Sequence, residues 1–169
     1  ATSRPRIHAY CDNLSVFGTD PVLVQQRADA VIEGIQERGF KVHEIESASD
    51  YAVSVGMEIN GLQGRVATKP VRRWKLRLVL RWLATRPHVS GKQLERAVGH
   101  SIFALMVNRP LLAIFRSVYE FIGANYERPA KLWDSCATEC RVAAALLPFA
   151  YADLRRPFSE QVTCFDASE

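Results

Sequence analysis

Residues 10–13 read Tyr-Cys-Asp-Asn and lie between two short segments in which apolar and polar residues alternate. This alternation predicts a β-strand on each side. Asp and Asn tolerate the backbone of a tight turn, so the segment predicts a β-hairpin with the carboxylate of Asp12 at its tip. A hairpin that presents the Asp12 carboxylate at its turn can hold a hard cation such as Mg²⁺ against phosphate oxygens. The motif is a weak signal by itself, because Asp-Asn turns are mostly structural.

Residues 65–86 contain eight basic residues and no acidic one. The recurrence of Arg73, Arg77 and Arg81 at every fourth position predicts a cationic ridge along a helix, suited to following a phosphate backbone. The alternative is a solvated helix face that keeps the chain soluble, but the lack of any acidic residue favours phosphate contact. The residues expected to bind nucleic acid are Lys69, Arg72, Arg73, Lys75, Arg77 and Arg81.

The elements that must position these groups fall into two zones. From residue 7 to about residue 70 the pattern is mixed. Asp20-Pro21 predicts the start of a helix that ends at Gly39, residues 40–45 alternate as a strand, and Asn60-Gly61 predicts a hairpin turn between strands at 51–59 and 62–67.

From residue 71 to about residue 154 the pattern predicts four helices. In the first helix Trp74, Leu78 and Trp82 are expected to face the core, opposite the cationic ridge. Ser90 and Gln93 form a capping box that predicts the start of the second helix. The third is expected over about 112–122 and the fourth over 130–147.

Composition and cysteine usage narrow the class of protein. The chain has 169 residues, is 48% hydrophobic and has a net charge of +4, which suits one compact core or two small lobes and permits nucleic-acid binding. The four cysteines lack zinc-site spacing, so they are expected to be reduced core thiols; Cys136 and Cys140, one turn apart, leave a shared metal as the alternative. No apolar run approaches 18 residues, so no membrane span is expected.

A series of short motifs in this order resembles one family over nearly the whole chain. The residues that carry the resemblance are Tyr10-Cys11-Asp12-Asn13 with Val16-Phe17-Gly18, Gly39-Phe40-Lys41-Val42-His43-Glu44, Val55-Gly56-Met57-Glu58-Ile59, Lys69-Pro70 with Arg73-Trp74, Val89-Ser90-Gly91 with Leu94-Glu95 and Gly99-His100, Leu132-Trp133, and Phe165-Asp166-Ala167-Ser168. The chain resembles the part of a retroelement polyprotein, of the LTR-type or DIRS-like kind, from the reverse-transcriptase active-site hairpin to the start of RNase H.

The resemblance implies an α+β fold in three parts. Residues 1–70 would be a partial palm, with the active-site hairpin and a primer-grip-like hairpin. Residues 71–157 would be an α-helical thumb and connection lobe. Residues 158–169 would be the first strand of a truncated RNase H-like domain.

The resemblance also implies roles for particular residues. Asp12 would be a catalytic, metal-binding carboxylate of the polymerase, and Asp166 would be the first catalytic, metal-binding carboxylate of RNase H. Gly56, Met57 and Glu58 would belong to the primer grip. Asn13 stands where the family has a second Asp; its amide keeps an oxygen ligand for the metal but lacks the charge, which weakens the site.

The family's other essential aspartate lies on a strand that precedes the hairpin and that this sequence does not include. We therefore expect a fragment of an RNA-directed DNA polymerase that neither polymerises nor cleaves by itself, with Mg²⁺ bound in the complete enzyme and not in this chain alone. The missing initiator Met and the apolar residues 162–165 at the end also suggest a piece of a longer polypeptide.

The expected partner of the parent enzyme is an RNA or DNA template-primer. The alternative is a non-catalytic structural or interaction subunit derived from a retroelement, with protein or RNA neighbours in a larger assembly. An intracellular location is expected, in the nucleus or cytoplasm for a retroelement product, with an organelle as a further alternative.

Overall fold

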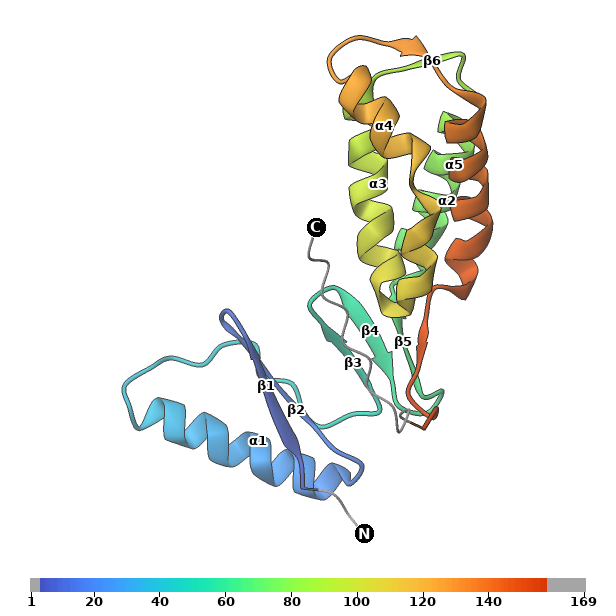
Figure 1. Cartoon of the computed structure of the whole chain (residues 1–169). Helices are drawn as coiled ribbons and strands as arrows, with labels where there is room; N and C mark the ends of the chain where they lie inside the picture. Colours follow the sequence, from blue (N-terminus) through green and yellow to red (C-terminus); the bar gives the residue numbers. More distant parts are fainter. Residues whose placement is uncertain (1–3, 158–169) are drawn as a thin grey trace, which may run out of the picture. The chain divides into compact units, whose positions relative to one another are not determined.

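The computed structural model describes residues 4–157 (Figure 1). The chain divides into two compact units, Ala1–Gln63 and Gly64–Glu169. Both contain α-helix, and the strand pairs within each unit are antiparallel. The protein is therefore of the α+β class, as the sequence predicts.

The first unit begins with a hairpin and a helix that follow the local sequence signals. Strand β1 (Arg6–Tyr10) pairs with β2 (Asn13–Phe17), and helix α1 (Pro21–Gln36) follows. The Asp20 carboxylate accepts hydrogen bonds from the first free N–H groups of the helix, as expected for an N-cap. The helix ends at Gln36 with Glu37 as its C-cap, three residues before the expected end at Gly39, which has a left-handed φ of +83° in the turn that follows.

The rest of the unit differs from the prediction. Residues 40–50 form no strand. The hairpin turn lies at Val55-Gly56, between β3 (Tyr51–Ser54) and β4 (Met57–Asn60), instead of at Asn60-Gly61. Both turn residues have positive φ, 50° and 74°, the combination that a two-residue turn of type I′ requires.

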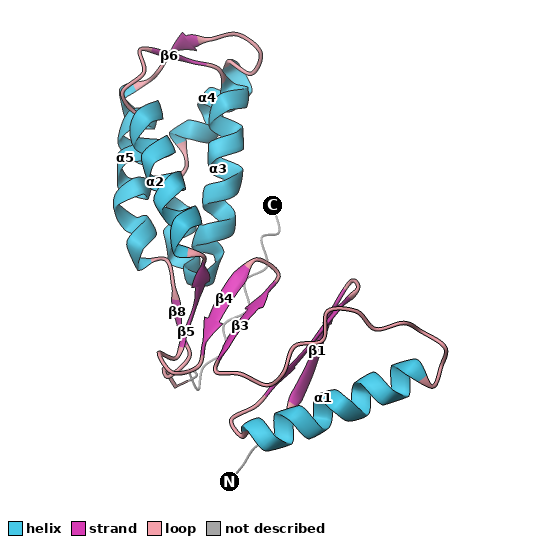
Figure 2. Ribbon diagram, turned by 180° about the vertical axis from the view of Figure 1, so that it is seen from behind, coloured by secondary structure: helices cyan, strands magenta, loops and turns pink. Residues whose placement is uncertain are grey.

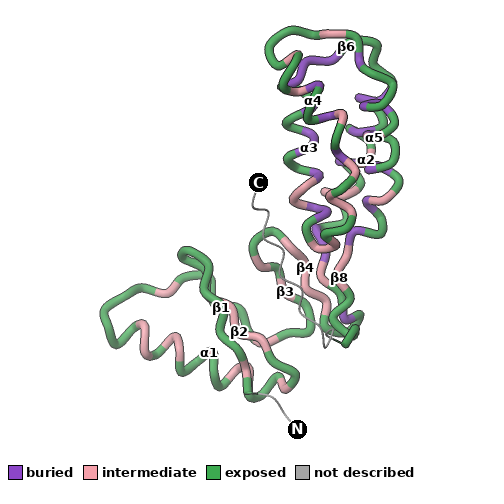
Figure 3. Tube along the Cα trace, in the orientation of Figure 1, coloured by how far each residue is buried: buried purple, intermediate pink, exposed green. Residues whose placement is uncertain are grey.

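None of residues 4–63 is buried, although many are apolar (Figure 3). Helix α1 has half-buried Val24, Val31 and Ile35 on one side, while Val22 is 62% exposed. The two strands of the β1–β2 hairpin pair only with each other within the described residues. A unit without a core of its own needs further apolar surface to cover it.

The described part of the second unit, residues 64–157, contains four α-helices with short strands at their ends (Figure 2). Its elements are β5 (Arg65–Thr68), α2 (Pro70–Leu83), β6 (His88–Val89), α3 (Gly91–Leu105), the 3₁₀ segment η1 (Met106–Ile114), α4 (Ser117–Ala124), β7 (Ala130–Lys131), α5 (Asp134–Leu146), the 3₁₀ segment η2 (Leu147–Phe149) and β8 (Ala152–Asp153). The pairs β5–β8 and β6–β7 are antiparallel, and the sequence patterns did not predict them.

The core of this unit is made by residues from all four helices. Leu80, Leu94, Leu105, Phe121 and Leu147 are fully buried. Helices α2 and α5 lie side by side in Figures 1 and 2 and make extensive contact. The inward face of α5 is lined by small residues, which lets the two helices approach closely: Cys136, Ala137, Cys140, Ala143 and Ala144.

The face of helix α2 that packs against the core is opposite to the face that its sequence predicts. Leu76, Leu80 and Leu83 are buried, whereas Trp74 and Trp82 are 58% and 49% exposed. The expectation that the tryptophans face the core is therefore wrong. The leucine stripe of α2 shares one buried core with the small residues of α5, which let the two helices pack closely.

Helix α3 begins as the sequence predicts, with a closely packed first turn. The capping box is present in full: Ser90 Oγ accepts from the Gln93 N–H, and the Gln93 side chain accepts from the Ser90 N–H. The N–H of Gly91 donates to the carbonyl of Asn125 at 2.7 Å. A Cβ at residue 91 would lie 2.6 Å from the carbonyl oxygen of Ile122, so a glycine is needed there.

The segment Gly91–Ile114 is long and apolar enough to cross a membrane by length and composition, and it is the one such segment within residues 4–157. Core helices of water-soluble proteins meet the same criterion, and α3 buries Leu94, Val98 and Leu105 among the other helices. The backbone is kinked at Asn108, two residues before Pro110. The prediction of no membrane span thus stays a prediction.

Candidate active-site hairpin and nucleic-acid interface

The tip of the β1–β2 hairpin is a two-residue turn made by Cys11 and Asp12. Tyr10 pairs with Asn13, so Asn13 is the first residue of β2 and not part of the turn, one position away from the expected Asp-Asn turn. Cys11 has a φ of +52°, a conformation that is uncommon for residues other than Gly, Asn and Asp. Such strained residues occur often at functional sites.

The Asp12 carboxylate at this tip is solvent-exposed, as the sequence predicts. Its Oδ1 atom accepts a hydrogen bond of 3.2 Å from the Asn13 side-chain amide. Within residues 4–157 no group of three His, Cys, Asp or Glu side chains is positioned to hold a metal ion. One carboxylate and one amide do not make a complete magnesium site, so a cation at Asp12 needs ligands from outside the described residues.

The residues expected to form a primer grip lie at the β3–β4 turn. Gly56 is exposed in the turn, and Met57 and Glu58 are half-buried at the start of β4. A side-chain hydrogen bond with Glu58 raises the pKa of Tyr51. The Glu58 carboxylate is thus engaged with the neighbouring strand.

Asp166, expected as the first RNase H carboxylate, lies outside the described residues, as does the whole of residues 158–169. Its predicted role stays a prediction.

The six basic residues expected to bind nucleic acid are not equally available. Lys69, Lys75 and Arg81 are exposed, whereas Arg72, Arg73 and Arg77 are half-buried. The row of arginines on α2 is therefore only partly a solvent-facing ridge. Since this row lies beside the buried leucines instead of opposite them, the stems of two arginines pack along the helix surface.

Three of these arginines have specific environments. Arg72 lies 4.6 Å from the ring centroid of Phe103 and contacts Nδ1 of His100 at 3.3 Å, which joins α2 to α3. The Nε atoms of Arg73 and Arg77 are buried and have no hydrogen-bond partner among the described residues. Arg72 thus serves packing within the lobe.

The face of α2 that points away from the core carries a stripe that the sequence interpretation assigned to the interior. We call it the outer face of α2 and define it by Val71, Trp74, Leu78 and Trp82, all between 49% and 65% exposed. Arginine side chains cover part of each ring: the Arg77 guanidinium carbon lies 5.5 Å from the Trp74 centroid, and that of Arg86 lies 4.2 Å from the Trp82 centroid. The signal that could have revealed this face is a second apolar stripe of leucines on the same helix, which offers the core an alternative.

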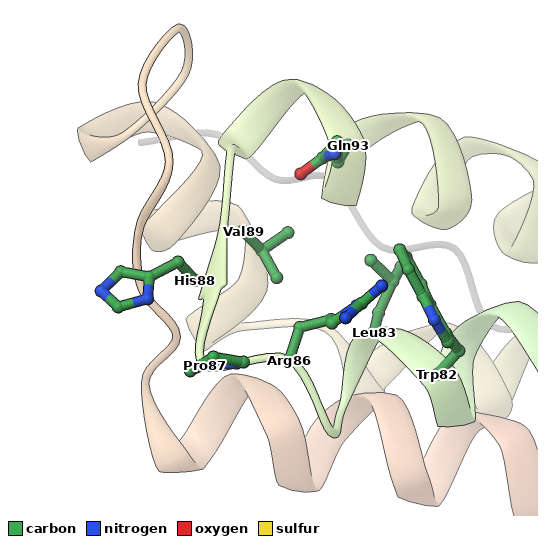
Figure 4. A pocket seen from close by; sticks show the side chains of 7 residues that line it. All are labelled: Trp82, Leu83, Arg86, Pro87, His88, Val89 and Gln93. Carbon is green, nitrogen blue, oxygen red and sulfur yellow. The ribbon is translucent and has the colours of Figure 1, made fainter.

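A half-open recess of about 290 Å³ lies at the C-terminal end of the outer face (Figure 4). In the close-up Arg86 projects toward the Trp82 ring, and Gln93 belongs to the first turn of α3. The residues that line the recess are Trp82, Leu83, Arg86, Pro87, His88, Val89 and Gln93. The Trp82 ring and the Arg86 guanidinium group thus both border this recess.

The cysteines divide into two kinds. Cys136 and Cys140 are fully buried on α5, as expected for core thiols, whereas Cys11 is exposed, contrary to that expectation. Burial raises the pKa of the Cys136 thiol to about 11 and that of Cys140 to about 12. Both thiols thus stay protonated near neutral pH, as buried core thiols do.

Comparisons with protein-family models, with curated proteins and with solved structures found no match for this chain.

Proposed function

We propose that this chain is the palm-to-thumb segment of an RNA-directed DNA polymerase of a retroelement. In this proposal Asp12 is a metal-binding carboxylate of the polymerase site, and the helical unit is the thumb and connection that holds the template-primer. The observation that carries the proposal is the exposed carboxylate of Asp12 at a two-residue hairpin turn whose first residue, Cys11, has a left-handed backbone.

This geometry suits phosphoryl transfer. An exposed carboxylate at the tip of a hairpin can approach a nucleotide phosphate. The polymerase reaction needs metal ions that bridge the attacking hydroxyl and the phosphate, and those ions need carboxylates from more than one strand. The described hairpin supplies one carboxylate, so the proposal requires a second strand that carries another.

The lack of a core in the first unit supports that requirement. The β1–β2 hairpin pairs with no other strand within the described residues, and residues 4–63 bury none of their side chains. An added strand beside the hairpin would satisfy its free backbone groups and cover its apolar face. The same strand is where the family has its other aspartate.

The helical unit supports the template-primer part of the proposal through its charge. No acidic residue interrupts residues 65–86, and Lys69, Lys75 and Arg81 are exposed along or just before α2. Exposed cations such as these, although they do not share one face of the helix, can neutralise phosphates without reading the base sequence, as a polymerase requires.

Primer extension with the native-length polypeptide tests the proposal. Extension of a DNA primer on an RNA template should depend on Mg²⁺, and Asp12→Asn should lower its rate by about 100-fold or more, because a direct metal ligand is lost. Asp50→Asn is the matched control, an exposed aspartate in the same unit that should leave the rate unchanged. Equal rates for Asp12→Asn and wild type would overturn the assignment of Asp12.

A non-catalytic interaction subunit is the second candidate function. The observation that favours it is the amount of exposed apolar surface, both on the first unit and on the outer face of α2. A native-length polypeptide that has no extension activity and is isolated as part of a stable assembly would support this candidate over the polymerase.

A further inference from the structure

Helix α2 is apolar on two opposite sides. Its leucines, Leu76, Leu80 and Leu83, face the core, and the outer face defined above points away from it. An apolar face normally needs a partner, because helices that are apolar all round are normally buried. The outer face of α2 is therefore a candidate binding surface.

The chemistry around the outer face narrows the kind of ligand. Lys75 and Arg81 flank the stripe and are exposed, and Arg77 and Arg86 lie against the two rings. Protein–protein interfaces are enriched in arginine and aromatic residues but depleted in lysine, so Lys75 beside the stripe is the residue that favours a different ligand. Cations interleaved with aromatic rings suit a ligand that combines negative charge with flat π-faces, which is the chemistry of an unpaired nucleic-acid strand.

The two rings are also well spaced for such a ligand. Trp74 and Trp82 are eight residues apart on one helix face, which corresponds to about 12 Å along the helix axis. Stacked bases in a strand repeat every 3.4 Å or so, and about three to four nucleotides would therefore connect the two rings. Because arginine holds each ring from one side, little rotamer freedom is lost when a base stacks on it.

We propose that the outer face of α2 binds single-stranded nucleic acid by stacking bases on Trp74 and Trp82, with Lys75 and Arg81 on the phosphates. Its residues all belong to the second unit, and the binding proposed for them does not depend on polymerase activity. A duplex keeps its bases stacked inside and cannot use the rings, so the site discriminates between single and double strands.

Binding of a fluorescent oligouridylate of about 12 nucleotides to the whole chain tests the proposal. Trp74→Ala and Trp82→Ala should each weaken binding by about tenfold, with no change in the dependence on salt, since each removes a stacking ring and no charge. Trp→Phe at either position should recover most of the affinity. Arg81→Ala should instead lower the slope of log affinity against log salt by about 0.7.

Two controls separate stacking from general effects. Phe149 is an exposed aromatic residue of the same unit, 63% exposed, and Phe149→Ala should leave binding unchanged. Binding of the same sequence as a duplex should change less than twofold in the Trp variants. Equal losses for single and double strands would overturn the proposal, as would an oligouridylate affinity that the double Trp variant leaves intact; the outer face would then be assigned to a protein partner.

Tryptophan fluorescence gives a test that does not depend on Ala variants. The chain has three tryptophans, and Trp133→Phe leaves Trp74 and Trp82 as the reporters. Oligouridylate should quench their emission in a saturable way at the concentrations at which it binds. Binding without quenching would contradict stacking on these rings.

Discussion

The guanidinium carbon of Arg86 lies 4.2 Å from the centre of the Trp82 ring, at the end of α2 (Figure 4). Arg77 and Trp74 repeat the arrangement, at 5.5 Å, two turns earlier. Each pair is worth about 0.5–1 kcal/mol at an exposed position. Each of the two exposed tryptophans thus has an arginine against its ring.

Arg72 and Arg81 should separate structural from ligand-binding roles on α2. Arg72→Ala removes the contacts with Phe103 and His100 and should lower the free energy of unfolding by about 1 kcal/mol, with little effect on nucleic-acid binding. Arg81→Ala should weaken nucleic-acid binding, with little effect on the free energy of unfolding. Urea denaturation and oligonucleotide titration of both variants measure the two effects. A loss of binding with unchanged stability for Arg72→Ala would contradict its packing role.

Gly91 should tolerate no side chain. Gly91→Ala would bring a Cβ within 2.6–3.0 Å of backbone atoms of Ile122, Asn125 and Tyr126, and should lower the free energy of unfolding by about 1–3 kcal/mol. Gly99→Ala is the matched control on the same helix, where a Cβ meets nothing within 4 Å. It should stabilise the helix by about 0.5–1 kcal/mol. Two variants of equal stability would contradict the close contact between α3 and α4.

Val55 should be a destabilising residue in its turn. Its φ of +50° is costly for a β-branched side chain, whereas Asn-Gly is the preferred pair for such a turn. Val55→Asn should therefore stabilise the β3–β4 hairpin by about 1 kcal/mol. Slower amide hydrogen exchange in β3 and β4 would show this stabilisation of the hairpin. Val53→Asn, the same change within the strand, should have the opposite sign because strands disfavour Asn.

The buried thiols predict a pH effect on stability. Their pKa values are raised on folding from an ordinary value of 9.0, to about 11 for Cys136 and about 12 for Cys140. The two thiols make their full contribution to the free energy of unfolding below pH 9. This contribution falls as the pH rises from there toward pH 11, since the unfolded chain loses thiol protons that the folded chain keeps. The free energy of unfolding of a Cys136→Ala/Cys140→Ala variant should fall less over this pH range. An equal loss would assign the effect to other groups.

Thiol labelling checks the same environments independently. In a Cys164→Ser background, an aromatic disulfide reagent at pH 8 should react at once with exposed Cys11 and with Cys136 and Cys140 only after unfolding. Rapid labelling of all three in the folded chain would contradict the burial of α5.

Local signals were sufficient where one residue decides a structure. The Asp20 cap and the Ser90–Gln93 capping box were predictable because side chain and backbone meet within three residues. The Asp12 hairpin was predictable to within one residue. The turn at Val55-Gly56 was not, because Asn60-Gly61 is the stronger turn signal and valine seldom adopts a positive φ.

The orientation of α2 depends on residues that are distant in sequence. The helix has two apolar stripes, and the larger side chains of Trp74 and Trp82 favour burial when the helix is considered alone. Leu80 is buried instead, in the same core as Cys140 and Ala143 of α5. The outer face of α2 could not be predicted without knowing that α5 is its packing partner.

The position of the metal ion in the native-length polypeptide, bound to an RNA template and a DNA primer, tests the role of Asp12 most directly. Manganese can replace Mg²⁺ there and be located in a crystal by its anomalous scattering. We expect a manganese peak at coordination distance from the Asp12 carboxylate, next to the primer end, and its loss in Asp12→Asn. A metal bound at the primer end with Asp12 far from it would contradict the assignment of this hairpin to the polymerase site.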